Sequence, residues 1–232
     1  MLHGKIGMMT KGINMSEQPE LNASGTGDER RDSKHKKAMK KQKANIDATV
    51  AAADIERGVA VLLTGNGKGK SSSAFGMVMR ALGYGYKVGV VQFIKGEILS
   101  GEEIYLRERY LQEQNPNVVF YQMGTGFTWD TQDRSADIAA AQKTWEVSKA
   151  LLADESVYLV VLDELTYMLA YDYLDEAEVL EALSNRPEHQ SLVVTGRGGG
   201  AKLQAIMDTV SEVKDIKHAF NDGIKARKGV DY

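Results

Sequence analysis

A loop rich in glycine and lysine carries the clearest chemistry in this 232-residue sequence. It reads Thr64-Gly-Asn-Gly-Lys-Gly-Lys-Ser-Ser72 and lies between an apolar run and a helical pattern. Glycines let a backbone curl so that its N–H groups point at an anion. In such a phosphate loop, Lys70 supplies positive charge for the terminal phosphates and Ser71 supplies a hydroxyl for magnesium. The loop therefore predicts a nucleoside triphosphate site.

The loop departs from the usual pattern in one place. The pattern G-x-x-x-x-G-K-[ST] begins with glycine, but Thr64 stands there and the glycine is displaced to Gly65. A glycine-rich turn without a ligand is the alternative, but the apolar run before the loop and the helical spacing after it favour a nucleotide site. The displaced glycine leaves open which way the triphosphate lies.

Two adjacent acids follow a second apolar run. Residues 157–162 lead into Asp163 and Glu164. In phosphate-loop proteins such a strand lies beside the strand before the loop, and its acid reaches magnesium together with the loop hydroxyl. Asp163 and Glu164 are therefore magnesium candidates, and strand alternation predicts that only one of them faces the ion directly. The alternative is a pair of acids that cap the next helix.

Two further strand ends carry residues that suit a ligand. Arg197 follows the apolar run 191–195, where it suits a phosphate or a ribose, although an ordinary turn arginine explains it nearly as well. Phe127 and Trp129 lie in a glycine-containing segment after the run 118–122. Large aromatic side chains at a strand exit are costly unless something flat covers them. They indicate either a planar ligand or a hydrophobic plug at the end of the sheet.

Apolar runs of strand length alternate with helical patterns from Gly58 onward. Continuous apolar strands between helices imply a parallel sheet buried on both faces, with ligands at the carboxyl ends of the strands. The sequence thus predicts an α/β fold with three layers, like that of P-loop NTPases, and a mostly parallel central sheet of about six strands. The expected strands are 59–64, 87–94, 118–122, 158–162, 191–195 and one within 211–220. The expected helices are 71–83, 102–112, 136–152, 174–183 and 202–209.

Composition excludes several classes of site. The chain has no cysteine, which removes disulfides, thiolate nucleophiles and cysteine-ligated metals. With 43% hydrophobic and 26% charged residues it has an ordinary globular profile. No apolar run approaches the roughly 20 residues that span a bilayer, and no apolar leader opens the chain. We therefore expect no membrane association and a cytoplasmic location.

The sequence divides into three parts. Residues 1–28 lack periodicity and are expected to be a disordered tail, residues 29–57 a basic helical arm, and residues 58–232 the catalytic domain. Between Glu29 and Asp47 eight Lys or Arg face three acids, a charge of +5, so the remainder carries −8 because the whole chain is −3. A long helix is expected over residues 31–55. It either covers a site or binds an anion, or it is simply a solvated helix.

Six segments together resemble one known family. In chain order they are 64–71, 88–96, 124–129, 161–167, 195–198 and 217–220. They resemble the phosphate-loop ATP:corrinoid adenosyltransferases of bacterial cobalamin synthesis and salvage, over about residues 46–232. The resemblance implies attack of a corrinoid Co(I) on the 5′-carbon of ATP, with triphosphate as the leaving group. It also implies an ATP orientation opposite to that of kinases, which fits the displaced glycine.

The same resemblance assigns roles to individual residues. It implies that Asn66 and Arg80 help to hold the nucleotide, that Ser71 and Glu164 bind magnesium, and that Phe127 and Trp129 pack under the corrin. Apolar rings there exclude a lower axial ligand and make the cobalt easier to reduce. A homodimer and an electron-donating reductase are the expected partners. The triphosphate is expected to lie on the loop residues Gly65, Asn66, Gly67, Lys68, Gly69, Lys70, Ser71 and Ser72.

Two alternatives share part of this pattern. A phosphoryl-transfer NTPase or small-molecule kinase shares the loop and the acids but gives Phe127 and Trp129 no role. A nucleic-acid-binding ATPase gives the basic arm a role, with strongly salt-dependent binding. The acidic remainder of the chain argues against a broad nucleic-acid surface, so nucleic acid is not an expected partner.

Overall fold

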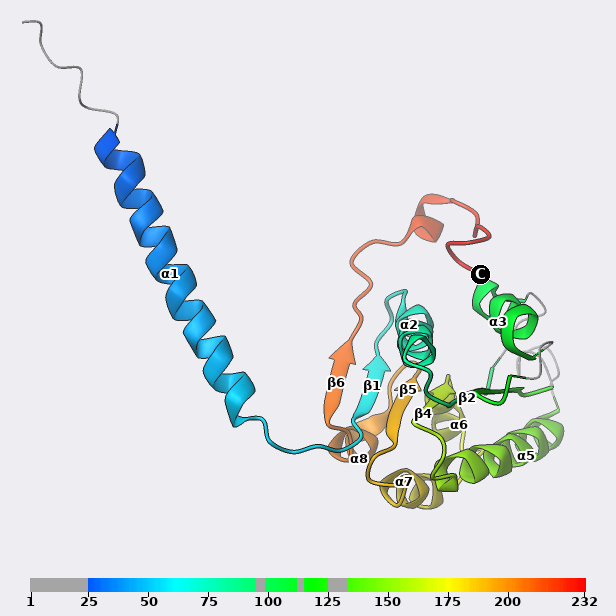
Figure 1. Ribbon diagram of the computed structural model, residues 1–232. Coiled ribbons are helices and arrows are strands. Elements are labelled where there is room, and N and C mark those ends of the chain that lie inside the picture. Colours follow the sequence, from blue (N-terminus) through cyan, green and yellow to red (C-terminus); the bar gives the residue numbers. More distant parts are fainter. Residues whose placement is uncertain (1–24, 95–98, 112–114, 125–132) are drawn as a thin grey trace, which may run out of the picture. The chain divides into compact units, whose positions relative to one another are not determined.

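The chain forms two compact units, residues 1–55 and 56–232. Figure 1 shows the computed structural model, which describes residues 25–94, 99–111, 115–124 and 133–232. The described part of the first unit contains one helix, α1 (Gly25–Ala52), which begins six residues before the expected helix 31–55 and ends three residues before its end. Residues 25–28 are therefore helical and not part of a tail, while residues 1–24 lie outside the described residues. Asp28 in the first turn stabilises this earlier start through the helix dipole.

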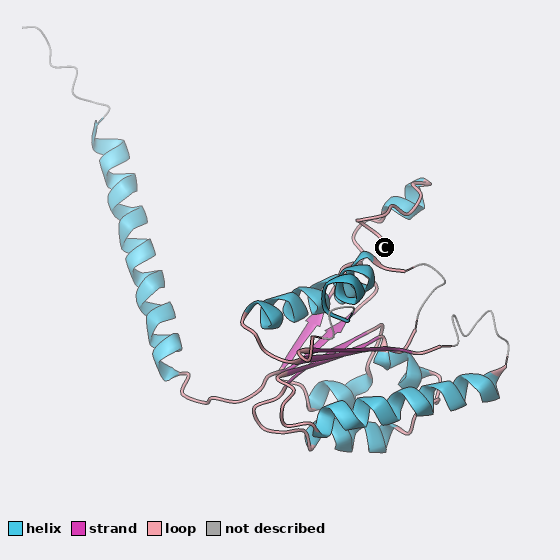
Figure 2. Cartoon of the chain, turned by 45° about the vertical axis from the view of Figure 1, so that its right-hand side comes forward, coloured by secondary structure: helices cyan, strands magenta, loops and turns pink. Residues whose placement is uncertain are grey.

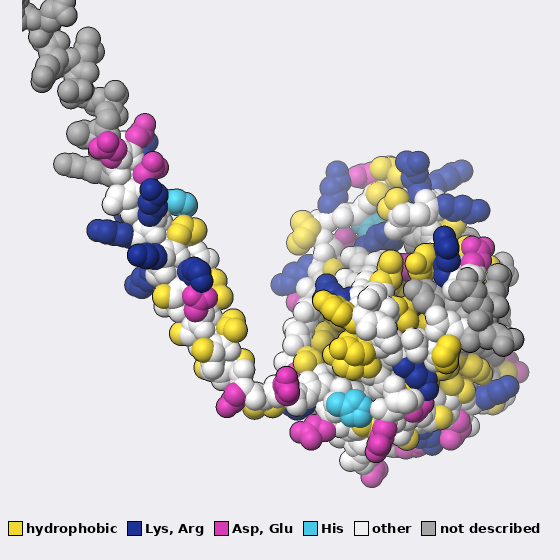
Figure 3. Space-filling model, in the orientation of Figure 1, with side chains coloured by type: hydrophobic (Ala, Val, Ile, Leu, Met, Phe, Trp, Pro, Cys, Tyr) yellow, Lys and Arg dark blue, Asp and Glu magenta, His cyan; other side chains and the backbone are white. Residues whose placement is uncertain are grey.

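Charge is unevenly distributed along α1. In Figure 3 the Lys and Arg side chains gather on its first half and hydrophobic side chains on its second half. Lys43 and Asp47 form an exposed ion pair, 2.8 Å between Nζ and Oδ2, at the i,i+4 spacing that supports a helix. The described side chains of α1 are exposed, so the helix buries no face within its own unit.

The second unit is built on one sheet of six parallel strands, which confirms the predicted sheet. The sheet order is β3-β2-β4-β5-β1-β6. The last strand overlaps the range expected for it in only two residues, because pairing with β1 sets Val61 opposite Thr209. The strands are β1 (Ala60–Thr64), β2 (Val88–Gln92), β3 (Val118–Gln122), β4 (Leu159–Asp163), β5 (Ser191–Thr195) and β6 (Thr209–Glu212).

Helices cover both faces of the sheet, as Figure 2 shows, so the predicted three layers are confirmed. On one face lie α2 (Lys70–Gly83) and α3 (Gly101–Leu106), which continues as a π-helix over Arg107–Leu111. Phe75 and Val78 of α2 pack there against β1, β4 and β5. The other face is covered by α5 (Arg134–Ala153), α6 (Leu165–Ala170), α7 (Glu176–Ser184) and α8 (Gly200–Ala205). All five residues of β2 and of β4 are buried, as a sheet covered on both faces requires.

The strand order corrects one expectation about the acidic strand. We expected β4, which ends in Asp163, to lie beside β1, but β5 lies between them. Strand β1 pairs with β5 and β6, and β4 pairs with β2 and β5. The carboxyl end of β5, at Thr195, is consequently inserted between the phosphate loop and the acids.

Helix boundaries differ from the sequence prediction where caps decide them. The side chain of Asp175 accepts the backbone N–H of Glu178, so α7 begins at Glu176 and not at residue 174. Asp133 caps α5 in the same way, and that helix begins at Arg134 instead of residue 136. The short helix α6, directly after the acids, was not predicted at all. The described residues contain no helix with the length and apolarity needed to cross a lipid bilayer.

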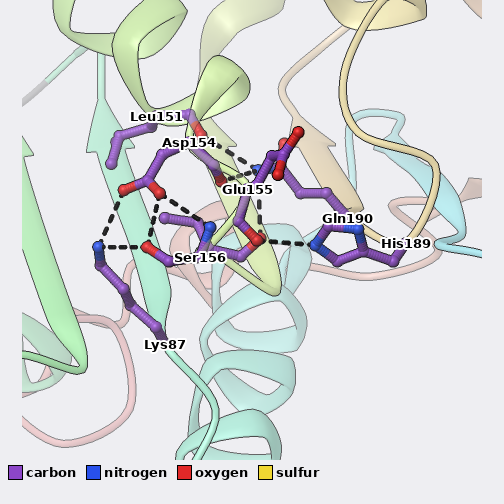
Figure 4. A network of polar contacts seen from close by, with 8 residues as sticks. Lys87, Leu151, Asp154, Glu155, Ser156, His189 and Gln190 are labelled. Atoms are coloured by element: carbon purple, nitrogen blue, oxygen red, sulfur yellow. Dashed lines mark hydrogen bonds and ion pairs between the residues drawn. The ribbon is translucent and has the colours of Figure 1, made fainter.

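A polar network closes the end of the sheet at which the strands begin (Figure 4). The amide Nε2 of Gln190 lies 3.1 Å from the carbonyl of Leu151 and 3.2 Å from those of Asp154 and Val157. The Nζ atom of Lys87 donates to Asp154 and Ser156, at 2.9 and 2.8 Å. These bonds satisfy carbonyls at the end of α5 and hold the starts of three strands. The loop and the acids emerge at the opposite end of the sheet, where the strands finish.

Candidate active site

A cavity of about 480 Å³ opens at the carboxyl ends of the strands. It lies where the phosphate loop, the exit of β4 and the turn after β5 meet. Ten of the residues predicted for the site line it: Asn66, Gly67, Lys68, Gly69, Lys70, Ser71, Ser72, Asp163, Glu164 and Arg197. Segments far apart in the sequence thus converge on one site.

The backbone of the phosphate loop is supported from the segment that follows β6. Gly67 donates its N–H to the carbonyl of Val213 at 2.7 Å. Gly65, at φ +102°, is not among the cavity-lining residues, and a Cβ on it would lie 2.4 Å from the same carbonyl. The displaced glycine is therefore required for close backbone packing beneath the loop. Gly69, at φ +113°, precedes α2 and has open space around its Cβ position.

The two loop lysines have different surroundings. The ammonium of Lys70 is buried, and its Nζ donates to the carbonyl of Gly67 at 2.9 Å. Burial lowers the pKa of this ammonium from its usual value, and the nearby Glu164 carboxylate opposes the change. Lys68 is more exposed and forms an ion pair with Asp231, 2.9 Å between Nζ and Oδ1. Of the two lysines, Lys70 is therefore the one whose ammonium contacts the loop backbone.

The two acids also differ. The Asp163 side chain is buried, and its two oxygens accept hydrogen bonds from Thr195 and Gln92. Glu164 has a left-handed backbone (φ +61°), and its Oε2 is buried without a hydrogen-bond partner among the described residues. Burial raises the pKa of the Glu164 carboxyl to about 7, Asp163 adds to the rise, and Lys70 opposes it.

The surroundings of Glu164 fit a magnesium ion. A buried carboxylate oxygen without a hydrogen-bond partner is suited to bind a cation or to accept a hydrogen bond from a ligand. Ser71 lines the same cavity. The described residues contain no group of three or more His, Cys, Asp or Glu placed to hold a metal. Magnesium commonly takes one or two protein oxygens and completes its octahedron with phosphate oxygens and water. Ser71 and Glu164 are the residues that would hold it here.

Besides Gly65, three predicted site residues are not brought to this cavity by the described structure. Arg80 lies ten residues beyond Lys70 on α2, about 15 Å along the helix axis. It lines a different pocket with Tyr84, Tyr86 and Tyr158, beside the starts of the strands, so its expected nucleotide contact is not supported. Phe127 and Trp129 fall within residues 125–132, outside the described residues.

A family model described as "ATP:corrinoid adenosyltransferase BtuR/CobO/CobP" matches residues 56–232, the whole of the second unit. The chain belongs to the ATP:corrinoid adenosyltransferase family. It is 49% identical over 201 residues to a corrinoid adenosyltransferase of Escherichia coli (strain K12), covering 87% of this chain and 99% of the relative. It is 50% identical over 218 residues to one of Pseudomonas aeruginosa, covering 94% of this chain and all of the relative. The "Corrinoid adenosyltransferase CobA" of Salmonella typhimurium is 50% identical over 201 residues, covering 87% of this chain and 99% of the relative.

Sequence reasoning missed several residues that line the cavity of this adenosyltransferase-family chain. Gln92 ends β2 as Asp163 ends β4, and that shared strand-end position was the available signal. Asp215, His218 and Asp231 come from the irregular C-terminal segment, where no periodicity marks them. The resemblance had singled out residues 217–220 without giving them a role.

The raised pKa of Glu164 makes two properties of this family member depend on pH. In the ligand-free protein the folded state keeps a proton that the unfolded state, with a pKa near 4.5, has lost. This contribution therefore lowers folding stability as the pH rises from about 4.5 to about 7. Cation binding has the opposite dependence, because below pH 7 the cation must displace that proton.

We expect ATP binding in the presence of Mn²⁺ to weaken by up to about tenfold for each pH unit below 7 and to level off above it. The measurement is a set of dissociation constants between pH 5.5 and 8.5. The same titration in EDTA removes the contribution of the nucleotide's own ionisation. The Glu164→Gln variant should lose the extra dependence, and an unchanged pH profile in that variant would contradict the assignment.

Proposed function

We propose that the chain transfers the 5′-deoxyadenosyl group of ATP to the Co(I) centre of a corrinoid and releases triphosphate. The observation that carries this proposal is the family match across the whole of residues 56–232. The cobalt–carbon bond forms with the electron pair of Co(I), and the carbon–oxygen bond breaks as its pair leaves with the triphosphate. The reaction needs no general base, because the nucleophile carries no proton.

The cavity supplies groups suited to holding and stabilising a triphosphate leaving group. The loop N–H groups and the start of α2 would hold the polyphosphate, and Lys70 and Lys68 would neutralise charge that develops on it. Magnesium, bound by Ser71 and Glu164, would add positive charge at the same oxygens. Arg197 lines the same cavity and is suited to a phosphate or ribose oxygen. These roles are supported by position and burial.

Several further properties belong to the same proposal. A reductase would deliver the electron that converts Co(II) to Co(I), and the protein would work as a homodimer in the cytoplasm. Residues 29–57 would form a basic arm and residues 58–232 the catalytic domain. The two compact units divide within two residues of that boundary, between residues 55 and 56. Sedimentation of the purified protein tests the dimer directly.

Product analysis tests the reaction itself. Mixing the protein with ATP, magnesium and chemically reduced corrinoid should give a light-sensitive adenosylcorrinoid spectrum and free triphosphate. Release of ADP and orthophosphate without a cobalt–carbon bond would instead support the phosphoryl-transfer alternative. Hydrolysis stimulated by nucleic acid would support an ATPase with the arm as its nucleic-acid contact.

Replacing Phe127 or Trp129 with alanine should slow turnover from Co(II) about tenfold more than turnover from pre-reduced Co(I). The reason is that the rings would exclude a lower axial ligand, which matters for reduction and not for the attack on ATP. Both assays use the same protein and the same ATP concentration. The control is Tyr84→Ala, which removes an exposed aromatic side chain near the starts of the strands. It should change neither rate. Equal losses in the two assays would contradict the role.

A further inference from the structure

One buried hydroxyl joins the two acids at the exit of β4. Thr195, at the end of β5, is fully buried. Its Oγ1 donates a hydrogen bond to Asp163 Oδ1 at 2.6 Å and accepts one from the backbone N–H of Glu164 at 3.0 Å. This contact requires β5 to lie directly beside β4, as it does in the sheet. The hydroxyl thus uses its donor and an acceptor position on neighbouring residues of one strand exit.

Asp163 is held from both neighbouring strands. Its Oδ1 receives the Thr195 hydroxyl from β5, and its Oδ2 receives Nε2 of Gln92 from β2 at 3.0 Å. Only 3% of Asp163 is exposed, although it borders the cavity. The carboxylate therefore lies along the rim of the sheet, where it links three strands.

Glu164 differs from Asp163 in its backbone conformation and in the partners of its carboxylate. Its left-handed backbone (φ +61°) is uncommon for a residue other than glycine and persists where the surroundings enforce it. The bond from its N–H to Thr195 is one such constraint. Its Oε2 has no hydrogen-bond partner in the described part of the chain, and a Cβ on Gly196 would lie only 3.3 Å from that atom. The backbone and its neighbours thus fix where this carboxylate lies.

We propose that Thr195 and Asp163 are positioning residues that hold Glu164 for the cation of the bound nucleotide. Asp163 acts through Thr195 and does not itself bind the cation. This inference rests on the proposed function for its nucleotide and cation, and it gives the two acids separate tasks. It also gives Thr195 a task, since a strand end that only packed would not need a hydroxyl shared between them.

The test compares Thr195→Val, which keeps the side-chain shape and loses the hydroxyl, with Thr195→Ser, which keeps the hydroxyl. Mn²⁺ affinity is measured by electron paramagnetic resonance in the presence of ATP, and ATP affinity is measured separately in EDTA. We expect Thr195→Val to weaken Mn²⁺ binding about tenfold, a loss typical for residues that orient a metal ligand. It should change ATP binding in EDTA less than twofold, because the loop and Lys70 are untouched. Thr195→Ser should match the wild type in both.

A merely structural role predicts a different pattern. In that case Thr195→Val would lower the melting temperature and weaken both binding measurements in parallel, or Thr195→Ser would be as impaired as Thr195→Val. Either result overturns the proposal, as does wild-type Mn²⁺ affinity in Thr195→Val. Adding Asp163→Asn to Thr195→Val should produce little further loss of Mn²⁺ affinity, because one residue acts through the other. Additive losses would show instead that Asp163 binds the cation independently.

The experiment also separates this inference from the proposed function. Mn²⁺ and ATP binding require no corrinoid. A protein that shows the expected Mn²⁺ pattern but forms no adenosylcorrinoid would refute the adenosyl transfer and leave the positioning roles standing. A protein that adenosylates corrinoid with wild-type Mn²⁺ affinity in Thr195→Val would do the reverse.

Discussion

Replacing Lys70 with methionine is expected to lower kcat/KM for ATP by about 10²–10³-fold and to leave the protein folded. The ammonium is buried, its Nζ donates to Gly67 within the loop, and it faces the cavity where the polyphosphate would lie. Methionine keeps the apolar stem and removes the charge, so the loss reports electrostatic stabilisation of the leaving group. Burial opposes the charged form of this lysine, so the melting temperature should not fall.

The control for this prediction is Lys68→Met. Lys68 belongs to the same loop but is more exposed and forms an ion pair with Asp231. An exposed and partly neutralised charge contributes less, so we expect a loss of about tenfold or smaller. Steady-state kinetics with ATP as the varied substrate and thermal melting of each variant are the measurements. Equal losses in the two variants would contradict the special position of Lys70.

Replacing Gly65 with alanine should destabilise the protein by about 2–4 kcal/mol and abolish detectable nucleotide binding. The added Cβ meets the carbonyl of Val213 at 2.4 Å, and φ +102° is disfavoured for alanine. Backbone atoms cannot move aside as a flexible side chain can, so the loop and the segment after β6 must separate. Urea unfolding and ATP titration measure the two effects.

Gly69→Ala is the matched comparison. Gly69 has a similar φ of +113°, but apart from its chain neighbours no heavy atom of the described residues lies within 4 Å of the position of its Cβ. This variant should therefore show only the conformational cost, about 1–2 kcal/mol. If both variants lose the same stability, the contact between Gly65 and Val213 does not constrain the loop.

Much of the fold could be predicted because each buried strand is a continuous apolar run. The phosphate loop was also visible, since its glycines, lysines and serines are contiguous. Strand order was not, because apolar strands of similar composition do not specify their neighbours, and β5 lies between β1 and β4. The contact between Thr195 and Asp163 could therefore not be predicted from the sequence alone.

The candidate site could be predicted only where its residues lie in contiguous motifs. Alternation along a strand predicted that Asp163 and Glu164 point oppositely, but β4 ends at Asp163 and Glu164 leaves the strand in a left-handed conformation. Alternation therefore cannot separate their roles. Asp231 reaches Lys68 from the last residues of the chain, through tertiary packing that no local pattern encodes.

The hydrogen bond between Gly67 and Val213 has a consequence for how the protein is made. The first strand ends at Thr64 and the sixth begins at Thr209, so residues 65–208 separate the two elements. Chains grow from the amino terminus, and domains fold as they leave the ribosome. A nascent chain that extends past Ser72 but not as far as Val213 holds every residue of the phosphate loop and lacks the carbonyl on which the loop rests. Competence to bind nucleotide should thus arise only after Val213 has left the ribosome, well after the loop itself has emerged.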